Sequence, residues 1–183
     1  MYVAPATQFL AKIWGVPFYS YMAGQPLTYQ GFGADGIALS ADGTDLYFGA
    51  VGKRYLYSIP TARLRADGDF SEALAQASVV SHGQKGVSDG YETDSNGFIY
   101  HGDAEQEAVS FYNPVNGTDQ VFVRDPRINW IDTMSTGSDG YLYFTSNQLC
   151  FGPLNWPGTD NRVRPFALFR AKLPNNGTKV NLV

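Results

Sequence analysis

The sequence has one cysteine, few charged residues and no long apolar segment. Cys150 has no second cysteine to pair with, and no neighbouring histidine completes a metal motif, so we expect it to be a small buried apolar group. Charged residues make up only 16% of the chain, and 17 acidic residues outnumber 13 basic ones, so nucleic acid is not an expected partner. No apolar run approaches the roughly 20 residues needed to span a bilayer, so no membrane partner is expected either.

Aromatic residues, glycine and proline are abundant. The chain has 12 tyrosines, 12 phenylalanines, 20 glycines and 10 prolines, which is typical of strands joined by tight turns. Only residues 70–78 (FSEALAQAS) have a helical pattern, and we expect this short helix in a loop between blades of the structure predicted below.

One sequence unit occurs three times. Each copy begins with an aspartate, reaches the glycine of an Asp-Gly or Asn-Gly pair eight residues later, and continues into an aromatic and β-branched stretch. Such pairs supply the positive φ angles of tight turns, so each copy is predicted to be a β-hairpin. The copies read DGIALSADGTDLYF from Asp35, DGYETDSNGFIYHG from Asp89 and DTMSTGSDGYLYFT from Asp132.

The spacing of these copies predicts a β-propeller. They start 54 and 43 residues apart, about the length of four short strands with their turns. A second arm ending in proline follows each copy (YLYSIP, AVSFYNP and FRAKLP), in the third case after an insertion at residues 150–165. We predict one all-β domain with blades at 33–80, 81–126 and 127–183, and with residues 1–32 as outer strands of a preceding blade. An all-β sandwich with accidental spacing is the alternative.

Three blades leave a propeller open, because closed rings have four or more. Lys12 interrupts the first apolar stretch and no basic segment precedes it, so no signal peptide is predicted. We expect a part of a longer protein, or a chain whose partner supplies the remaining blades.

Several stretches in order resemble a known family. From about Gly33 to Leu173 the chain is similar to the C-terminal half of the major royal jelly protein and Yellow family. Its turn-rich, cysteine-poor sequence looks more like the microbial members than like the insect ones. The matching stretches are DGIALSADGTDLYFGAVGKRYLYSIPTARL, SDGYETDSNGFIY, VRDPRINWIDTMSTGSDGYLYFTSNQL and ALFRAKL. The resemblance implies a six-bladed β-propeller roughly twice this length, secreted, with a small-molecule pocket at one end of its channel. Members include nutritive, pigmentation-linked and amine-binding salivary proteins, so fold alone does not decide the activity.

The repeated aspartates are the first candidate site. Equivalent positions in neighbouring blades would bring Asp35, Asp89 and Asp132 to the same end of the channel, where they would hold a small cation or amine. The alternative is structural, because an aspartate at a repeated turn often accepts hydrogen bonds from nearby backbone amides.

Residues that depart from the repeat complete the predicted ligand site. Glu92 has no acidic counterpart in the other copies and is expected to face the channel as a further carboxylate. By resemblance, Thr133 beside Asp132, together with Asn147, maps near the amine-contacting residues of the amine-binding members. His101 is a candidate for the channel mouth, whereas His82 lies in a polar run and is expected to be solvated.

Two N-x-S/T sequons begin at Asn116 and Asn176, each just after a strand that ends in proline. We expect both in exposed loops, where they would be glycosylated if the protein is secreted to the extracellular space.

Four hypotheses for function remain open. The leading one is a propeller that binds a small organic ligand without assignable catalysis, and it needs no cofactor. The others are a calcium-dependent lactonase-like hydrolase using Asp89, Glu92 and Asn147, a dopachrome-type tautomerase using Glu92 or His101, and a storage or structural protein. No nucleophile elbow, P-loop or dinucleotide motif decides whether the chain is an enzyme, and its catalytic residues are unknown.

Overall fold

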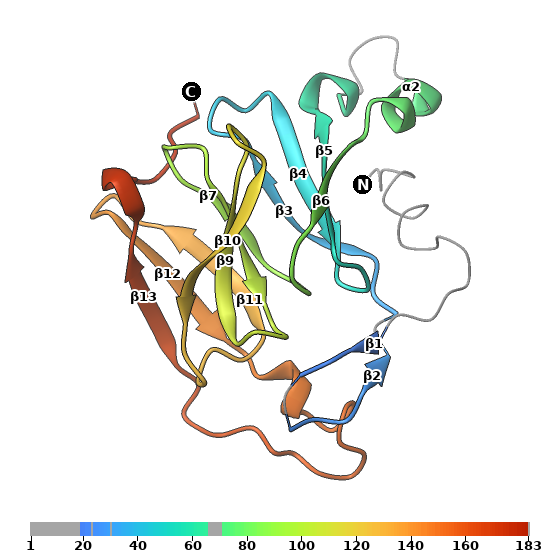
Figure 1. Cartoon of the computed structure of the whole chain (residues 1–183), viewed down its shortest axis with the longest axis vertical. Helices are drawn as coiled ribbons and strands as arrows, with labels where there is room; N and C mark the ends of the chain where they lie inside the picture. The colour runs from blue at the N-terminus through green and yellow to red at the C-terminus, as the bar shows by residue number, and fades with distance from the viewer. Residues whose placement is uncertain (1–18, 23, 30, 66–70, 183) are drawn as a thin grey trace.

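The computed structural model describes residues 19–22, 24–29, 31–65 and 71–182. Three antiparallel sheets, two of four strands and one of three, follow one another along the chain and fan out around a common axis (Figure 1). The innermost strand of the second sheet contacts that of the first and that of the third. This is the arrangement of blades in a β-propeller, so the predicted fold class is confirmed: the chain is a partial, three-bladed propeller.

The first blade is a meander in which each strand pairs with the next. A 3-10 helix, η2 (Thr61–Arg63), and an α-helix, α2 (Glu72–Ala77), lie between its last two strands. Ser71 begins α2, its Oγ accepting a hydrogen bond from the Leu74 amide at 3.3 Å. The strands are β3 (Ala34–Leu39), β4 (Asp45–Ala50), β5 (Tyr55–Pro60) and β6 (Val80–Gln84).

The predicted helix is therefore present but lies within the first blade and not between blades. Because β6 pairs with β5, the first sheet also extends to Gln84, four residues past the predicted boundary at residue 80.

The second and third blades repeat this order. A long segment that includes the 3-10 helix η3 (Leu149–Phe151) separates the last two strands of the third blade, and the 3-10 helix η4 (Pro174–Asn176) follows that blade. The second blade contains β7 (Tyr91–Thr93), β8 (Ile99–Asp103), β9 (Ala108–Asn113) and β10 (Thr118–Arg124); the third contains β11 (Ile131–Thr136), β12 (Tyr141–Ser146) and β13 (Leu168–Lys172).

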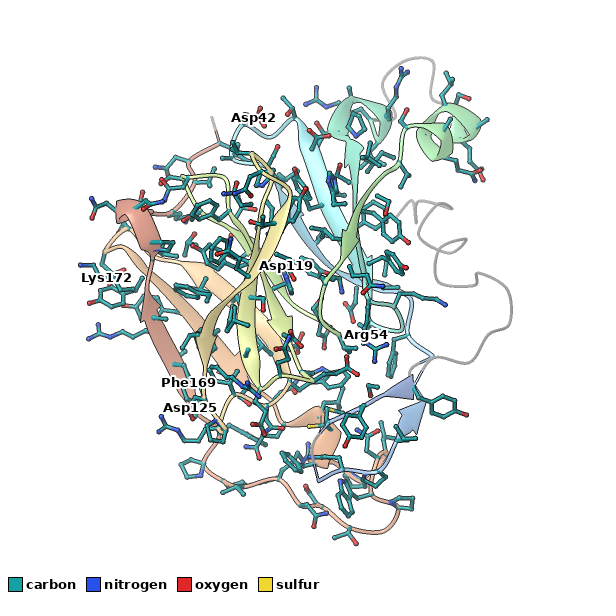
Figure 2. All side chains as sticks on the ribbon, viewed as in Figure 1. Asp42, Arg54, Asp119, Asp125, Phe169 and Lys172 are labelled. Carbon is teal, nitrogen blue, oxygen red and sulfur yellow. The ribbon has the colours of Figure 1, made fainter. Side chains whose placement is uncertain are left out.

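The three predicted hairpins are confirmed, and glycine is required at each turn. Gly43, Gly97 and Gly140 have φ angles of 72°, 80° and 81°, in the region that other residues rarely adopt. The predicted second arms are β5, β9 and β13. Figure 2 shows Asp42, in the β3–β4 turn, and Arg54, in the β4–β5 turn, at opposite ends of the first blade.

The core lies between blades, because side chains alternate between the two faces of each strand. In β8, Ile99 packs toward Tyr47 and Leu56 of the first blade. The next residue, Tyr100, packs toward Phe144 of the third. The middle blade therefore holds its two neighbours through opposite faces.

The ends of the chain meet the blades differently. Residues 1–18 lie outside the described part, and β1 (Tyr19–Ser20) and β2 (Thr28–Tyr29) form a small separate sheet. Residues 177–182, the C-terminal segment, cross from the third blade to the second, where Lys179 forms a β-bridge with Asp94. Among the described residues, no helix has the length and apolar character to cross a bilayer.

Candidate functional site

The first residues of the inner strands are held unusually close together. A β-carbon on Gly36 would lie 1.8 Å from the Asp89 carbonyl oxygen, and one on Gly90 would lie 2.0 Å from the Asp132 carbonyl oxygen. Only glycine permits this approach. The Asp-Gly dipeptides of the first two repeats therefore bring each inner strand against the aspartate of the next blade.

This packing gathers Asp35, Asp89 and Asp132, which we call the aspartate cluster. The pKa of Asp89 is raised to about 6, mainly by burial. A hydrogen bond from Trp130 lowers this pKa, whereas the negative charges of Asp132 and Asp35 raise it. Asp89 is half-buried, whereas the other two are exposed. Within the described residues, none of the three forms an ion pair with a basic side chain.

Two neutral donors contact the aspartate cluster. The buried Trp130 donates from Nε1 to Asp89 Oδ2 at 2.7 Å, and Asn147 donates from Nδ2 to Asp132 Oδ2 at 3.3 Å. The exposed Thr133 follows Asp132 along the strand. Five of the six predicted ligand residues, all except Glu92, thus start or border one end of the inner strands.

Glu92 lies apart from this group. It is three residues beyond Asp89 in β7, roughly 10 Å along the strand. Its Oε1 accepts from the Thr93 amide at 2.8 Å and its Oε2 from the Thr136 amide at 3.3 Å. Glu92 therefore links β7 to β11 and does not add to the aspartate cluster.

Both histidine predictions are wrong. His101 is fully buried in β8, where its Nε2 lies 2.8 Å from Asp119 Oδ1, because its side chain points between blades and not to the channel mouth. His82 is half-buried, since its ring nitrogens lie 3.1 Å from the Tyr112 hydroxyl and 2.8 Å from Ser58 Oγ. Strand pairing, which a polar run does not disclose, brings these partners together.

Three charged or titratable side chains, Lys85, His101 and Asp103, lie buried near the blade 1–blade 2 interface. Together with the more exposed Asp119, which contacts His101, we call them the Lys85 network. Burial lowers the pKa of Lys85 to about 7, although Asp103 and Asp119 oppose the shift. Its Nζ donates to the Gly86 carbonyl at 3.0 Å and lies 5.6 Å from the Tyr91 ring centroid. Asp119 appears in the middle of the molecule in Figure 2. Unlike the aspartate cluster, this network contains both signs of charge.

No metal centre is evident in the part of the chain that the structure describes. No three His, Cys, Asp or Glu side chains there are grouped so as to hold an ion. Cys150 is buried, as predicted, against Met22 and Trp130, and burial raises the pKa of its thiol to about 12.

The two sequons are exposed. Asn116 lies in the β9–β10 turn, where its Oδ1 accepts from the Thr118 amide at 3.1 Å, and Asn176 lies at the end of η4. Both positions are open to solvent, as a glycosylation site requires.

Comparison with known proteins identifies the family. Several solved structures share the fold: regucalcin, a calcium-binding protein from Agrobacterium tumefaciens (19% identity, TM-score 0.52, 90% of this chain and 53% of that one), a gluconolactonase from Xanthomonas campestris (14%, 0.57, 91% and 50%), and a luciferin-regenerating enzyme (16%, 0.52, 90% and 54%). The chain spans about half the length of these proteins, and at such identities the likeness concerns the fold alone. No curated protein sequence matches the chain. The sequence profile described as "Major royal jelly protein" matches residues 17–155, most of the three blades together with the segment before them, and the chain therefore belongs to the major royal jelly protein family.

Proposed function

We propose that this protein binds a small organic cation at the aspartate cluster. The observation that carries the proposal is the convergence of three carboxylates from three successive inner strands with no basic partner in the described residues. Like charges at one place repel, and a positive ligand would relieve that repulsion. Burial is the main cause of the raised pKa of Asp89, and the negative charges of Asp132 and Asp35 add to it.

Asn147 and Thr133 would orient the ligand. The Asn147 amide already donates to Asp132, and its Oδ1 accepts from the Leu149 amide at 2.9 Å, so its position is fixed from both ends. An amide and a hydroxyl distinguish ligands by hydrogen bonding without performing chemistry. Binding without assigned catalysis is therefore the proposed activity.

The proposal extends to the whole protein. We infer a six-bladed ring in which further blades complete the channel wall, since the chain spans about half the length of the propellers it resembles. Family membership supports export from the cell, and glycosylation at the exposed Asn116 and Asn176 would accompany it.

Calorimetric titration of the full chain with 2-phenylethylamine tests the site. Asn147→Ala should weaken binding about fivefold, because one hydrogen bond to the ligand is lost. It should lower the melting temperature only slightly, through loss of the bonds to Asp132 and the Leu149 amide. Asn161→Ala, at an exposed asparagine in the segment that follows, is the matched control and should change neither value. An equal loss of affinity and thermal stability in Asn147→Ala would contradict the proposal, as would equal binding of the neutral 2-phenylethanol.

A further inference from the structure

Trp130 lies where the third blade meets the aspartate cluster. It is 2% exposed and directly precedes β11, whose second residue is Asp132. Its φ angle of 55° falls in the left-handed region, which a bulky side chain rarely adopts. Such residues persist where the surrounding structure enforces them, and they gather at functional sites. The contacts of Trp130 therefore bear on the role of this conformation.

Two hydrogen bonds of Trp130 reach site residues on different blades. The indole Nε1 donates to Asp89 Oδ2 of the second blade at 2.7 Å. The backbone carbonyl accepts from the Asn147 amide, just after β12 of the third blade, at 3.2 Å. Asn147 in turn donates from Nδ2 to Asp132 Oδ2 at 3.3 Å. One residue thus bonds to two members of the proposed cation site and reaches a third through Asn147.

The backbone next to Trp130 is tied to the segment that follows β12. The Asn129 amide donates to Ser146 Oγ at 2.9 Å, and the Gln148 amide donates to the Asn129 carbonyl at 3.1 Å. The Cys150 thiol donates to Asn129 Oδ1 at 3.0 Å. These bonds fix the backbone of Trp130, while burial in one apolar cluster with Cys150 restricts its side chain.

A β-bulge follows Trp130 and changes the direction of the next side chains. The register of β11 against β12 shifts between Ile131 and Met134, where two residues of β11 oppose one of β12. These two residues, Asp132 and Thr133, are both exposed, although adjacent side chains of a regular strand point to opposite faces. The irregular start of β11 therefore presents both residues at the open end of the strand.

We propose that Trp130 is the positioning residue of the cation site on the aspartate cluster. Its indole hydrogen orients the Asp89 carboxylate and its backbone carbonyl orients Asn147, so both are held in one arrangement before a ligand arrives. Groups that are already ordered bind more tightly, because the ligand does not have to order them. This inference rests on the proposed function, since it concerns the same site.

The indole N–H signal of Trp130 tests the contact without a ligand. In a ¹H–¹⁵N NMR titration of the full chain between about pH 4 and pH 8, this signal should move, because a bond to an ionised carboxylate is stronger than one to its protonated form. Asp35 and Asp132 also carry charge nearby, so Asp89→Asn separates their effect and should remove most of the movement. A Trp130 signal that does not change with pH would overturn the proposal.

A matched pair of tryptophan substitutions tests the effect on binding. Trp130→Phe removes the indole donor and keeps much of the apolar bulk, so the affinity for 2-phenylethylamine should fall about fivefold in calorimetric titration. Trp156→Phe also removes one indole hydrogen bond, from Nε1 to Gln25 Oε1 at 3.2 Å, and should leave the affinity unchanged. Equal affinities of the two variants would overturn the proposal.

A double-mutant cycle separates positioning from packing. In an Asp89→Ala background, Trp130→Phe should cost no further affinity, because the acceptor of the indole hydrogen is already absent. The same fivefold loss in that background would show that the indole acts through packing alone and would overturn the proposal. The NMR titration needs no tryptophan variant, so it decides the question even if Trp130→Phe does not fold.

The two proposals about this site fail in different ways. If 2-phenylethylamine binds the wild type and Asp89→Asn equally well, the proposed function fails and this inference fails with it. If Asp89→Asn weakens binding but Trp130→Phe does not, the proposed function stands and the role of Trp130 alone is overturned.

Discussion

The aspartate cluster and the Lys85 network both include residues of the second blade but differ in how their charges are balanced. In the Lys85 network a lysine and a histidine accompany two carboxylates, and Lys85, His101 and Asp103 are each at most 5% exposed. In the aspartate cluster three carboxylates meet only neutral donors, and two of the three are exposed. Charges that are buried together with their counterions hold blades in register, whereas unbalanced charges at an open end leave a role for a ligand.

The largest expected difference between the two groups is in stability, and it is tested by replacing one residue of each group with alanine. His101→Ala should destabilise the protein by about 3 kcal/mol, because it leaves a cavity and removes the partner of Asp119. Asp132→Ala should change the free energy of unfolding by less than about 0.5 kcal/mol, since its side chain is exposed. Urea denaturation measures both. Similar losses in the two variants would show that the aspartate cluster is structural as well.

The pH dependence of Lys85 sharpens the comparison. Burial lowers the native pKa from 10.5 to about 7, so between these values the unfolded chain binds more protons and stability rises with pH. Lys85→Met lacks this pH-dependent contribution to stability. The stability of the wild type relative to Lys85→Met should therefore grow by about 3 kcal/mol between pH 7 and pH 10. The exposed Lys172→Met is the control, and a constant difference would mean that Lys85 is not desolvated.

Asp89→Asn should increase the free energy of unfolding, whereas truncation in the Lys85 network should decrease it. Because the native pKa of Asp89 is raised from 3.8 to about 6, the native state binds the extra proton and stability falls as pH rises through this window. Asparagine still accepts from Trp130 but carries no charge. The variant should gain about 1 kcal/mol at pH 7.5, a value discounted for the partial exposure of the site. It should also bind 2-phenylethylamine more weakly, and a loss of stability at pH 7.5 would contradict unrelieved repulsion.

Calcium should have the smallest effect. No group of three metal-ligating side chains occurs among the described residues, so millimolar calcium followed by a chelator should move the melting temperature by less than about 1 °C. A rise of several degrees, reversed by the chelator, would favour the lactonase-like hypothesis.

The repeat made much of the fold predictable, because turn chemistry is local. Asp-Gly and Asn-Gly pairs specify their own backbone angles, and the spacing of Asp35, Asp89 and Asp132 placed them at equivalent ends of successive strands. The contribution of Trp130 was not predictable, since it depends on a left-handed φ of 55° at a non-glycine residue.

Other features required knowledge of which blade face meets which neighbour. The side chains of His101 and Tyr91 point to the opposite face of their strands from those of the adjacent residues. This alternation alone does not say which face of the strand packs against another blade. The C-terminal segment returns to the second blade, where Lys179 forms a β-bridge with Asp94, and no short pattern in the sequence predicts such a contact.

The crossing of the C-terminal segment also bears on how the protein folds. Leu182 comes so near the first hairpin that a β-carbon on Gly43 would lie 3.2 Å from it. This contact joins residues far apart along the chain, and distant contacts of this kind slow folding because a large loop must be ordered first. Each blade is a local meander that can form early. We therefore expect the blades to assemble first and the C-terminal segment to pack against them last.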